Sequence, residues 1–103
     1  METIPNTFKK YGYDFKLLKR IGSIVMYEQS QTVSHTQRII QYEVHNIQVA
    51  EESIFQGLLY PKRETLAKSG EFGCYGWSYD KYEKAMEKFN ELVEIMKGDD
   101  NSS

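Results

Sequence analysis

An apolar stripe near the C-terminus constrains the fold more than any other feature of the sequence. Between Lys81 and Lys97, apolar side chains recur at spacings of three and four, at Tyr82, Ala85, Met86, Phe89, Leu92, Val93 and Met96. This spacing is typical of one face of an amphipathic helix, and the other face carries interleaved Lys and Glu. Asp80 is placed to cap its N-terminus, and Gly98 is placed to end it. The stripe must be buried against a second layer.

Several β-prone segments predict that this second layer is an antiparallel sheet. Residues 15–20 and 24–29 flank Gly22-Ser23, which indicates a hairpin. In residues 38–49, apolar side chains alternate with polar ones up to Val44 and then change phase at Ile47, which predicts a bulge near Asn46. Residues 30–37 are polar and are predicted to form a loop or a hairpin tip, and residues 72–79 read as the last strand.

The predicted fold is therefore α+β, with an antiparallel sheet of three to four strands and one C-terminal amphipathic helix packed on one face. The length of 103 residues indicates a single domain, residues 1–103, with flexible tails at 1–7 and 98–103. The face away from the helix must be covered by the N-terminal segment, by residues 50–71 or by a second copy of the chain. The last case would make the protein a homodimer.

Composition narrows the classes of function. No apolar run is long enough to cross a bilayer, and Met1 is followed by Glu2 and Pro5 rather than by an apolar leader, so we expect no membrane partner. The single cysteine, Cys74, fits a reducing compartment, and we expect a cytoplasmic protein. The formal net charge of −2 argues against a surface that binds nucleic acid throughout.

The sequence offers no recognisable catalytic or metal-binding constellation. Two His, in a polar loop at 35 and on the polar phase of a strand at 45, cannot with one Cys complete a typical zinc site. Cys74 reads as a structural thiol within a strand, although a Cys74–His45 pair on neighbouring strands is conceivable. We therefore expect no catalytic residues, no metal and no cofactor.

Two sets of residues are candidates for binding a partner. The apolar stretch within residues 50–71 is the default functional loop, and its candidates for contact with a protein are Phe55, Leu58, Leu59 and Tyr60. A basic stretch and a strand aromatic form the second set, candidates for nucleic-acid binding, at Lys16, Lys19, Arg20, Arg38 and Trp77. Both sets also have a structural interpretation, because strand lysines commonly face solvent and strand aromatics commonly form the core.

Two families resemble parts of the chain. Glu71-Phe72-Gly73-x-Tyr75-x-Trp77-x-Tyr79, together with Phe15-x-Leu17-x-x-Arg20-x-Gly22 and Tyr42-x-Val44-His45, resembles small uncharacterised proteins of phages and mobile elements in gut bacteria over about residues 8–97. That resemblance implies no activity and no catalytic residue. The step Trp77-Ser78-Tyr79-Asp80 is similar to the strand-to-helix junction of AP2-type DNA-binding domains, whose sheet reads DNA.

These observations favour a non-enzymatic interaction module that binds a protein partner and is encoded by a phage or mobile element. A nucleic-acid-binding accessory protein is the alternative, and a small enzyme is a third class that only a site joining Cys74 and His45 would support. The identity of the partner does not follow from the sequence.

Overall fold

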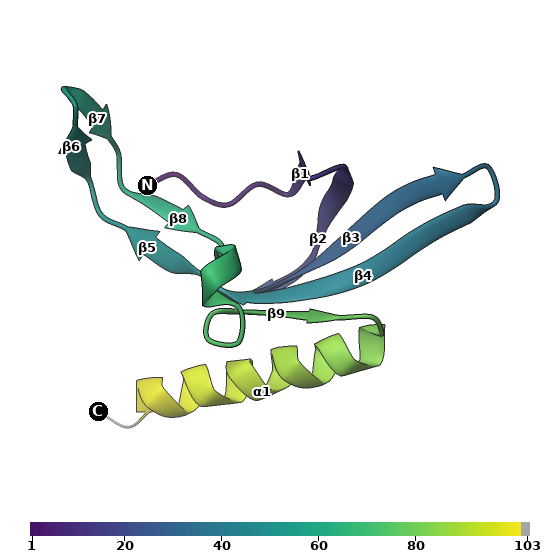
Figure 1. Ribbon diagram of the computed structural model, residues 1–103. Coiled ribbons are helices and arrows are strands. Elements are labelled where there is room, and N and C mark those ends of the chain that lie inside the picture. The colour runs from purple at the N-terminus through teal and green to yellow at the C-terminus, as the bar shows by residue number, and fades with distance from the viewer. Residues whose placement is uncertain (102–103) are drawn as a thin grey trace.

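The structure, a computed structural model, describes residues 1–101 and consists of one five-stranded sheet, one long helix and a projecting arm (Figure 1). The five strands lie in the order β1-β2-β3-β4-β9 and pair antiparallel. Their bounds are β1 Thr7–Lys10, β2 Tyr13–Ile21, β3 Ile24–Ser34, β4 Gln37–Asn46 and β9 Gly76–Tyr79, and the helix is α1 Tyr82–Asn101. The predicted α+β class with a C-terminal helix on the sheet is confirmed, but five strands exceed the predicted three to four.

The hairpin of β2 and β3 has the predicted turn. Ile21 pairs with Ile24 across the turn, and Gly22 has a φ of 59° there. A Cβ at Gly22 would also lie 2.7 Å from the Met96 sulfur, so glycine meets both the backbone and the packing requirement. The additional strand β1 joins β2 through Tyr11 and Gly12, whose φ values of 55° and 79° are typical of a two-residue hairpin turn.

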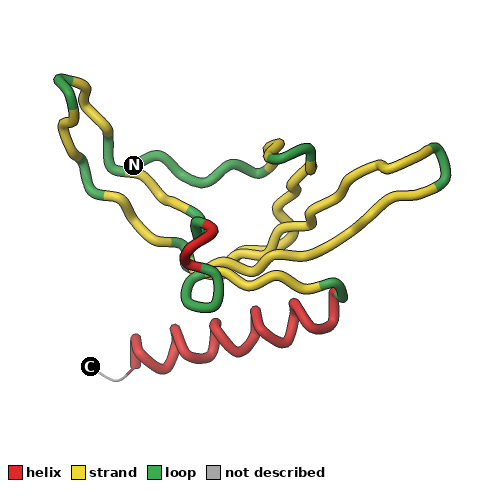
Figure 2. The backbone as a smooth tube through the Cα atoms, in the orientation of Figure 1, coloured by secondary structure: helices red, strands yellow, loops and turns green. Residues whose placement is uncertain are grey.

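The hairpin of β3 and β4 is longer than predicted. Residues 30–37 are largely strand, since β3 continues to Ser34 and β4 begins at Gln37, with a turn at residues 35–36. The pairing of Ser30 with Ile40 and of Thr32 with Arg38 carries the ladder beyond the sheet as a projecting ribbon (Figure 2). His35 lies at this turn, as the polar sequence predicted.

The predicted bulge near Asn46 is wrong, and the change of phase has another cause. The register of β4 against β3 is continuous from Asn46 to Arg38, and β4 simply ends at Asn46. Val44 belongs to the core under the helix, whereas Ile47 belongs to a second core on the opposite face. Both phases are apolar because both faces of the sheet are covered.

The first core lies between the sheet and α1. Fully or nearly buried side chains from β3, β4 and α1 meet there, namely Ile24, Met26, Val44, Ala85, Phe89, Leu92 and Val93. The predicted apolar stripe of the helix thus packs on the sheet. The helix begins later than the capping prediction requires, because it starts at Tyr82 and the carbonyl of Lys81 accepts the bond from Ala85 N. It also continues through Gly98 to Asn101, so the predicted stop at Gly98 is wrong. The predicted tail residues 102–103 lie outside the described part of the chain.

The second core covers the other face, and the N-terminal segment supplies part of its cover. Ile4 is buried against Phe15, Val25, Tyr27 and Ile47. The Tyr27 hydroxyl donates a 2.6 Å hydrogen bond to the carbonyl of Pro5, which holds this segment over the sheet. Burial raises the pKa of Tyr27 to about 12. Of the three coverings considered from the sequence, two are observed: the N-terminal segment, and residues 50–71 through Leu66, which packs against the same core.

Residues 48–65 form an arm rather than an irregular loop. The strands β5 Gln48–Ala50 and β8 Arg63–Thr65 pair at its root, and β6 Ser53–Phe55 and β7 Leu58–Tyr60 pair at its tip. The arm leaves the sheet on the side away from the β3–β4 ribbon, and both rise from the face opposite α1 (Figures 1 and 2). A stretch without a clear apolar period thus forms two short antiparallel strand pairs, one after the other.

The last strand is shorter than predicted. Residues 72–75 form a turn after the 3₁₀ turn η1 Ser69–Glu71, and β9 begins only at Gly76. Cys74 is therefore exposed in a turn, not buried within a strand. Gly76 is required by close packing, because a Cβ there would lie 2.6 Å from the Phe72 ring and 2.7 Å from the Ala67 Cβ.

Candidate functional site

The end of the arm presents an apolar surface to solvent. We call Ile54, Phe55, Leu58, Leu59 and Tyr60 the apolar tip, and their exposed fractions range from 38% to 75%. Phe55 pairs with Leu58, and Ile54 pairs with Leu59. Because successive residues of a strand point to opposite faces, these two pairs make both faces of the tip apolar. The four residues predicted as protein contacts all belong to this surface, and Ile54 is a fifth that the sequence analysis did not single out.

The turn of the apolar tip is conformationally defined. Gln56 and Gly57 have φ values of 52° and 78°, which is the pattern of a two-residue type I′ turn. This turn matches the twist of the two flanking strands, so it fixes the register of Phe55 against Leu58. The apolar tip is therefore the end of a hairpin whose turn and strand register are defined.

A cluster of polar contacts anchors the root of the arm to the sheet. The Arg20 guanidinium donates hydrogen bonds of 2.9 and 2.6 Å to the two Glu64 carboxylate oxygens, and Ile4 N donates one of 3.2 Å to Glu64 Oε1. Glu2 adds backbone bonds to Lys62 and Glu64. The hydrogen bond from Arg20 lowers the pKa of the Glu64 carboxyl and raises that of the Arg20 guanidinium. One carboxylate thus joins the arm, strand β2 and the N-terminal segment.

The residues predicted to bind nucleic acid do not form one surface. By strand pairing, four of them lie on the sheet face that packs on the helix, namely Lys16, Lys19, Arg38 and Trp77. Arg20 lies on the other face, because it pairs with Val25 of the second core. Four of the predicted residues already have internal contacts, one of which is the hydrogen bond from Arg38 to the Ser30 hydroxyl. The Lys19 ammonium lies over the Phe89 ring, Trp77 packs against the first core with Lys88 over its ring, and Arg20 is bound to Glu64.

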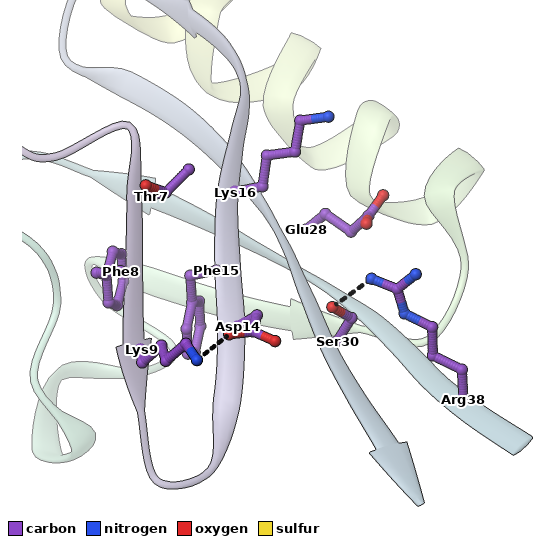
Figure 3. Close-up of a pocket in the computed structure, with 9 residues that line it drawn as sticks. All are labelled: Thr7, Phe8, Lys9, Asp14, Phe15, Lys16, Glu28, Ser30 and Arg38. Atoms are coloured by element: carbon purple, nitrogen blue, oxygen red, sulfur yellow. Dashed lines mark hydrogen bonds and ion pairs between the residues drawn. The ribbon is translucent and has the colours of Figure 1, made fainter. Parts of the chain in front are cut away.

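A hollow of 340 Å³ beside β1, β2 and β3 contains two of these cations (Figure 3). Lys16 lies opposite Glu28 in the pairing of β2 with β3. The Arg38 guanidinium donates a 2.9 Å hydrogen bond to the Ser30 hydroxyl. At the same hollow, the Lys9 Nζ atom lies 3.8 Å from Oδ1 of Asp14. Acids interleave with the bases throughout this hollow, which weakens its attraction for a phosphate backbone.

A second cleft, on the face opposite α1, has polar groups in its floor. It has a volume of 430 Å³ and is lined by Gln29, Glu43 and His45 from the sheet, by aromatic side chains of β1 and β2, and by residues 66–69 and Phe72. The His45 ring nitrogen Nδ1 accepts a 3.1 Å hydrogen bond from Ala67 N, and Nε2 lies 2.9 Å from Glu43 Oε1. An acceptor at Nδ1 fixes the neutral tautomer with its proton on Nε2, so the ring donates to Glu43.

The sequence analysis missed Gln29 and Glu43 as candidates. Glu43 lies on the strand phase that was read as polar, whereas Gln29 was not considered by itself. Gln29 is 9% exposed because it shares its face with Val25 and Tyr27 of the second core. The available signal was the phase itself, since Gln29 follows Val25 and Tyr27 at alternate positions. His45 uses both ring nitrogens in internal bonds and Cys74 is exposed in a turn, so no activated thiol pair is present there.

Comparisons with protein-family models, with curated proteins and with solved structures gave no match. Among the side chains that the structure describes, those of residues 1–98, no three His, Cys, Asp or Glu gather as a metal site would require. Over the same residues, no helix is both long and apolar enough to span a bilayer. The interpretation of function therefore rests on the geometry of the arm and of the clefts.

Proposed function

We propose that this protein is an interaction module that inserts the apolar tip of its arm into an apolar groove of a partner protein. The observation that carries the proposal is that both faces of the tip are apolar and exposed. A hairpin that lies flat on a partner buries one face and keeps the other polar, whereas apolar residues on both faces are typical of strands covered on both sides. The partner is therefore expected to enclose the tip.

The structure of the arm supports this role in two further ways. The type I′ turn and the paired strands define the tip before binding, which lowers the conformational entropy that binding must remove. The Arg20–Glu64 pair fixes the root, so the tip projects in a defined direction from the sheet. Exposed apolar patches of this kind commonly mark interaction sites.

The resemblance to phage and mobile-element proteins supports a host or viral protein as the partner. Nucleic-acid binding is less well supported, because the cations predicted for it are divided between two faces and interleaved with acids. We therefore place the function in the arm rather than in the basic residues of the sheet.

Site-specific photo-crosslinking in cells of the natural source tests this proposal. A photo-reactive phenylalanine derivative replaces Phe55 in one variant and Val33, an exposed apolar residue of the β3–β4 ribbon, in a control. We expect one protein to be crosslinked from position 55 and not from position 33. The crosslink should disappear when Leu58→Ser and Leu59→Ser are added, without a lower Tm, because both side chains are exposed.

Once the partner is known, Phe55→Ala should weaken binding by about 2 kcal/mol, or roughly thirtyfold in Kd, as at a buried aromatic hot spot. Equal crosslinking from both positions, or a crosslinked partner that survives the double serine substitution, would contradict the proposal. A crosslink only between two copies of the chain would replace it with self-association through the arm.

A further inference from the structure

Gln29 is the unusual group of the cleft on the face opposite α1. Its side-chain oxygen Oε1 is buried and has no hydrogen-bond partner in the protein, and the residue lines the cleft. Its neighbour on β2 is Phe15, which offers no donor. A buried acceptor without a donor is unfavourable, so a ligand whose N–H reaches this oxygen after a rotation of the Gln29 side chain relieves that cost on binding.

Glu43 presents a second acceptor on the same floor. His45 holds one of its oxygens, and the side chain remains 16% exposed at the cleft. In the register, Tyr27 pairs with Glu43 and Gln29 pairs with Gln41, so Gln29 and Glu43 are diagonal neighbours on one face of β3 and β4. Such neighbours lie about 7–8 Å apart at the backbone, within reach of one planar ligand for long side chains. The floor therefore offers the Glu43 carboxylate directly, and the Gln29 oxygen after a rotation of its side chain, to a planar ligand with adjacent N–H groups.

The walls and rim of the cleft add two further requirements on the ligand. Aromatic rings line it at Phe8, Tyr11, Tyr13, Phe15 and Phe72, which favours a flat ring that can stack. Lys10 and Lys68 line it as well, against the single carboxylate of Glu43, so the lining carries one net positive charge. This excess positive charge would repel a cationic guanidinium, whereas it would attract a ligand that combines an edge of N–H donors with an anionic group.

We propose that this cleft binds a guanine mononucleotide. Guanine is the base whose Watson–Crick edge carries a ring N–H beside an amino group, and these donors would pair with Glu43 and Gln29. The base would stack on the aromatic walls, as bases do in single-strand-binding modules, and the phosphate would lie near Lys10 and Lys68. This site is separate from the arm and does not depend on the function proposed for it.

Calorimetric titration of the intact protein with GMP, AMP, UMP, arginine and inorganic phosphate tests the proposal. We expect GMP to bind at least tenfold more tightly than AMP or UMP. Gln29→Met should weaken GMP binding at least tenfold, whereas Gln37→Met, the same change at the exposed start of β4, should leave it unchanged. Because Gln29 Oε1 has no partner in the free protein, Gln29→Met should not lower Tm.

Glu43→Gln provides a second, independent variant. An amide has one acceptor oxygen and one donor nitrogen, so this change should reduce the preference for GMP over AMP rather than abolish binding altogether. Chemical-shift changes in ¹H–¹⁵N spectra should fall on β1, β2 and residues 66–72 rather than on the arm. The proposal is overturned by no GMP binding, by equal affinity for the nucleotides, by tighter binding of arginine, or by a Gln29→Met variant that binds GMP normally.

Discussion

The Arg20–Glu64 pair should be the most important polar contact for the stability of the arm. Glu64→Gln removes the carboxylate charge from a pair with two hydrogen bonds, at 2.9 and 2.6 Å, in which the Glu64 side chain is only 8% exposed and Arg20 is 33% exposed. An exposed pair contributes up to about 1 kcal/mol, and breaking a fully buried one costs about 3–5 kcal/mol. The intermediate burial places the expected loss at about 2 kcal/mol, equivalent to a Tm lower by roughly 8–16 °C.

The pH dependence of this loss follows from the shifted pKa of Glu64. The hydrogen bond from Arg20 holds that pKa below its ordinary value of 4.5, so the folded state favours the ionised carboxylate. A lowered pKa in the folded state stabilises the protein fully above the unfolded value, and the contribution is lost as the pH falls through the folded value. The difference in unfolding free energy between the natural chain and Glu64→Gln should therefore be largest near neutral pH and should shrink below pH 4.5.

Urea denaturation monitored by circular dichroism at about pH 7 and about pH 3 measures both quantities. Glu51→Gln is the matched control, because Glu51 lies 3.8 Å from Lys62 on the same arm with side chains 76% and 50% exposed, and it should change stability by less than about 1 kcal/mol. Equal effects of the two substitutions at neutral pH, or an effect of Glu64→Gln that persists unchanged in acid, would refute the reasoning.

Three further predictions concern the second core and the turn before β9. Tyr27→Phe removes the 2.6 Å hydrogen bond to the Pro5 carbonyl and should lower the free energy of unfolding by about 1 kcal/mol. Because the pKa of Tyr27 is raised to about 12, the stabilisation by the hydroxyl should persist to pH 10 and be lost as the pH rises further. Denaturation of both proteins across alkaline pH measures this difference. Gly76→Ala forces the Phe72 ring to move, since the new Cβ would lie 2.6 Å from it, and should lower Tm with chemical-shift changes around Phe72; an unchanged Tm would contradict this packing. Cys74 should react with a thiol reagent in the folded protein at the rate of an exposed thiol, and protection until unfolding would contradict its place in the turn.

The elements that the sequence predicted are those with a local periodic signal. The helix was found because its apolar spacing of three and four extends over several turns, and the β2–β3 hairpin because β-prone segments flank Gly22. Strand β1 has too few residues to show alternation, and only Phe8 of its four residues packs on a core. The short strands of the arm are likewise defined by pairing with each other, which a single-sequence period cannot reveal.

The two sites differ in how far they could be foreseen. For the apolar tip, the sequence left two alternatives, packing on the sheet or a surface for a partner, because its side chains are apolar in a stretch without periodicity. The cleft was not foreseen, because Glu43 was read as part of the polar phase of a half-buried strand and Gln29 was not singled out. That interpretation is wrong because Ile4 and the rest of the N-terminal segment cover the second face of the sheet. This long-range contact determines which polar residues of that face are buried. Burial of a polar side chain depends on such contacts more than on its own strand.

The covering of both sheet faces has a consequence for how this chain can vary. Along Ile24, Val25, Met26 and Tyr27, every side chain is at most 1% exposed, because odd and even positions enter different cores. A half-buried strand tolerates polar replacements at every second position, but this segment has no permissive position. Relatives that have diverged widely should therefore keep four consecutive large apolar residues here, and this unbroken block is a usable signature for finding them.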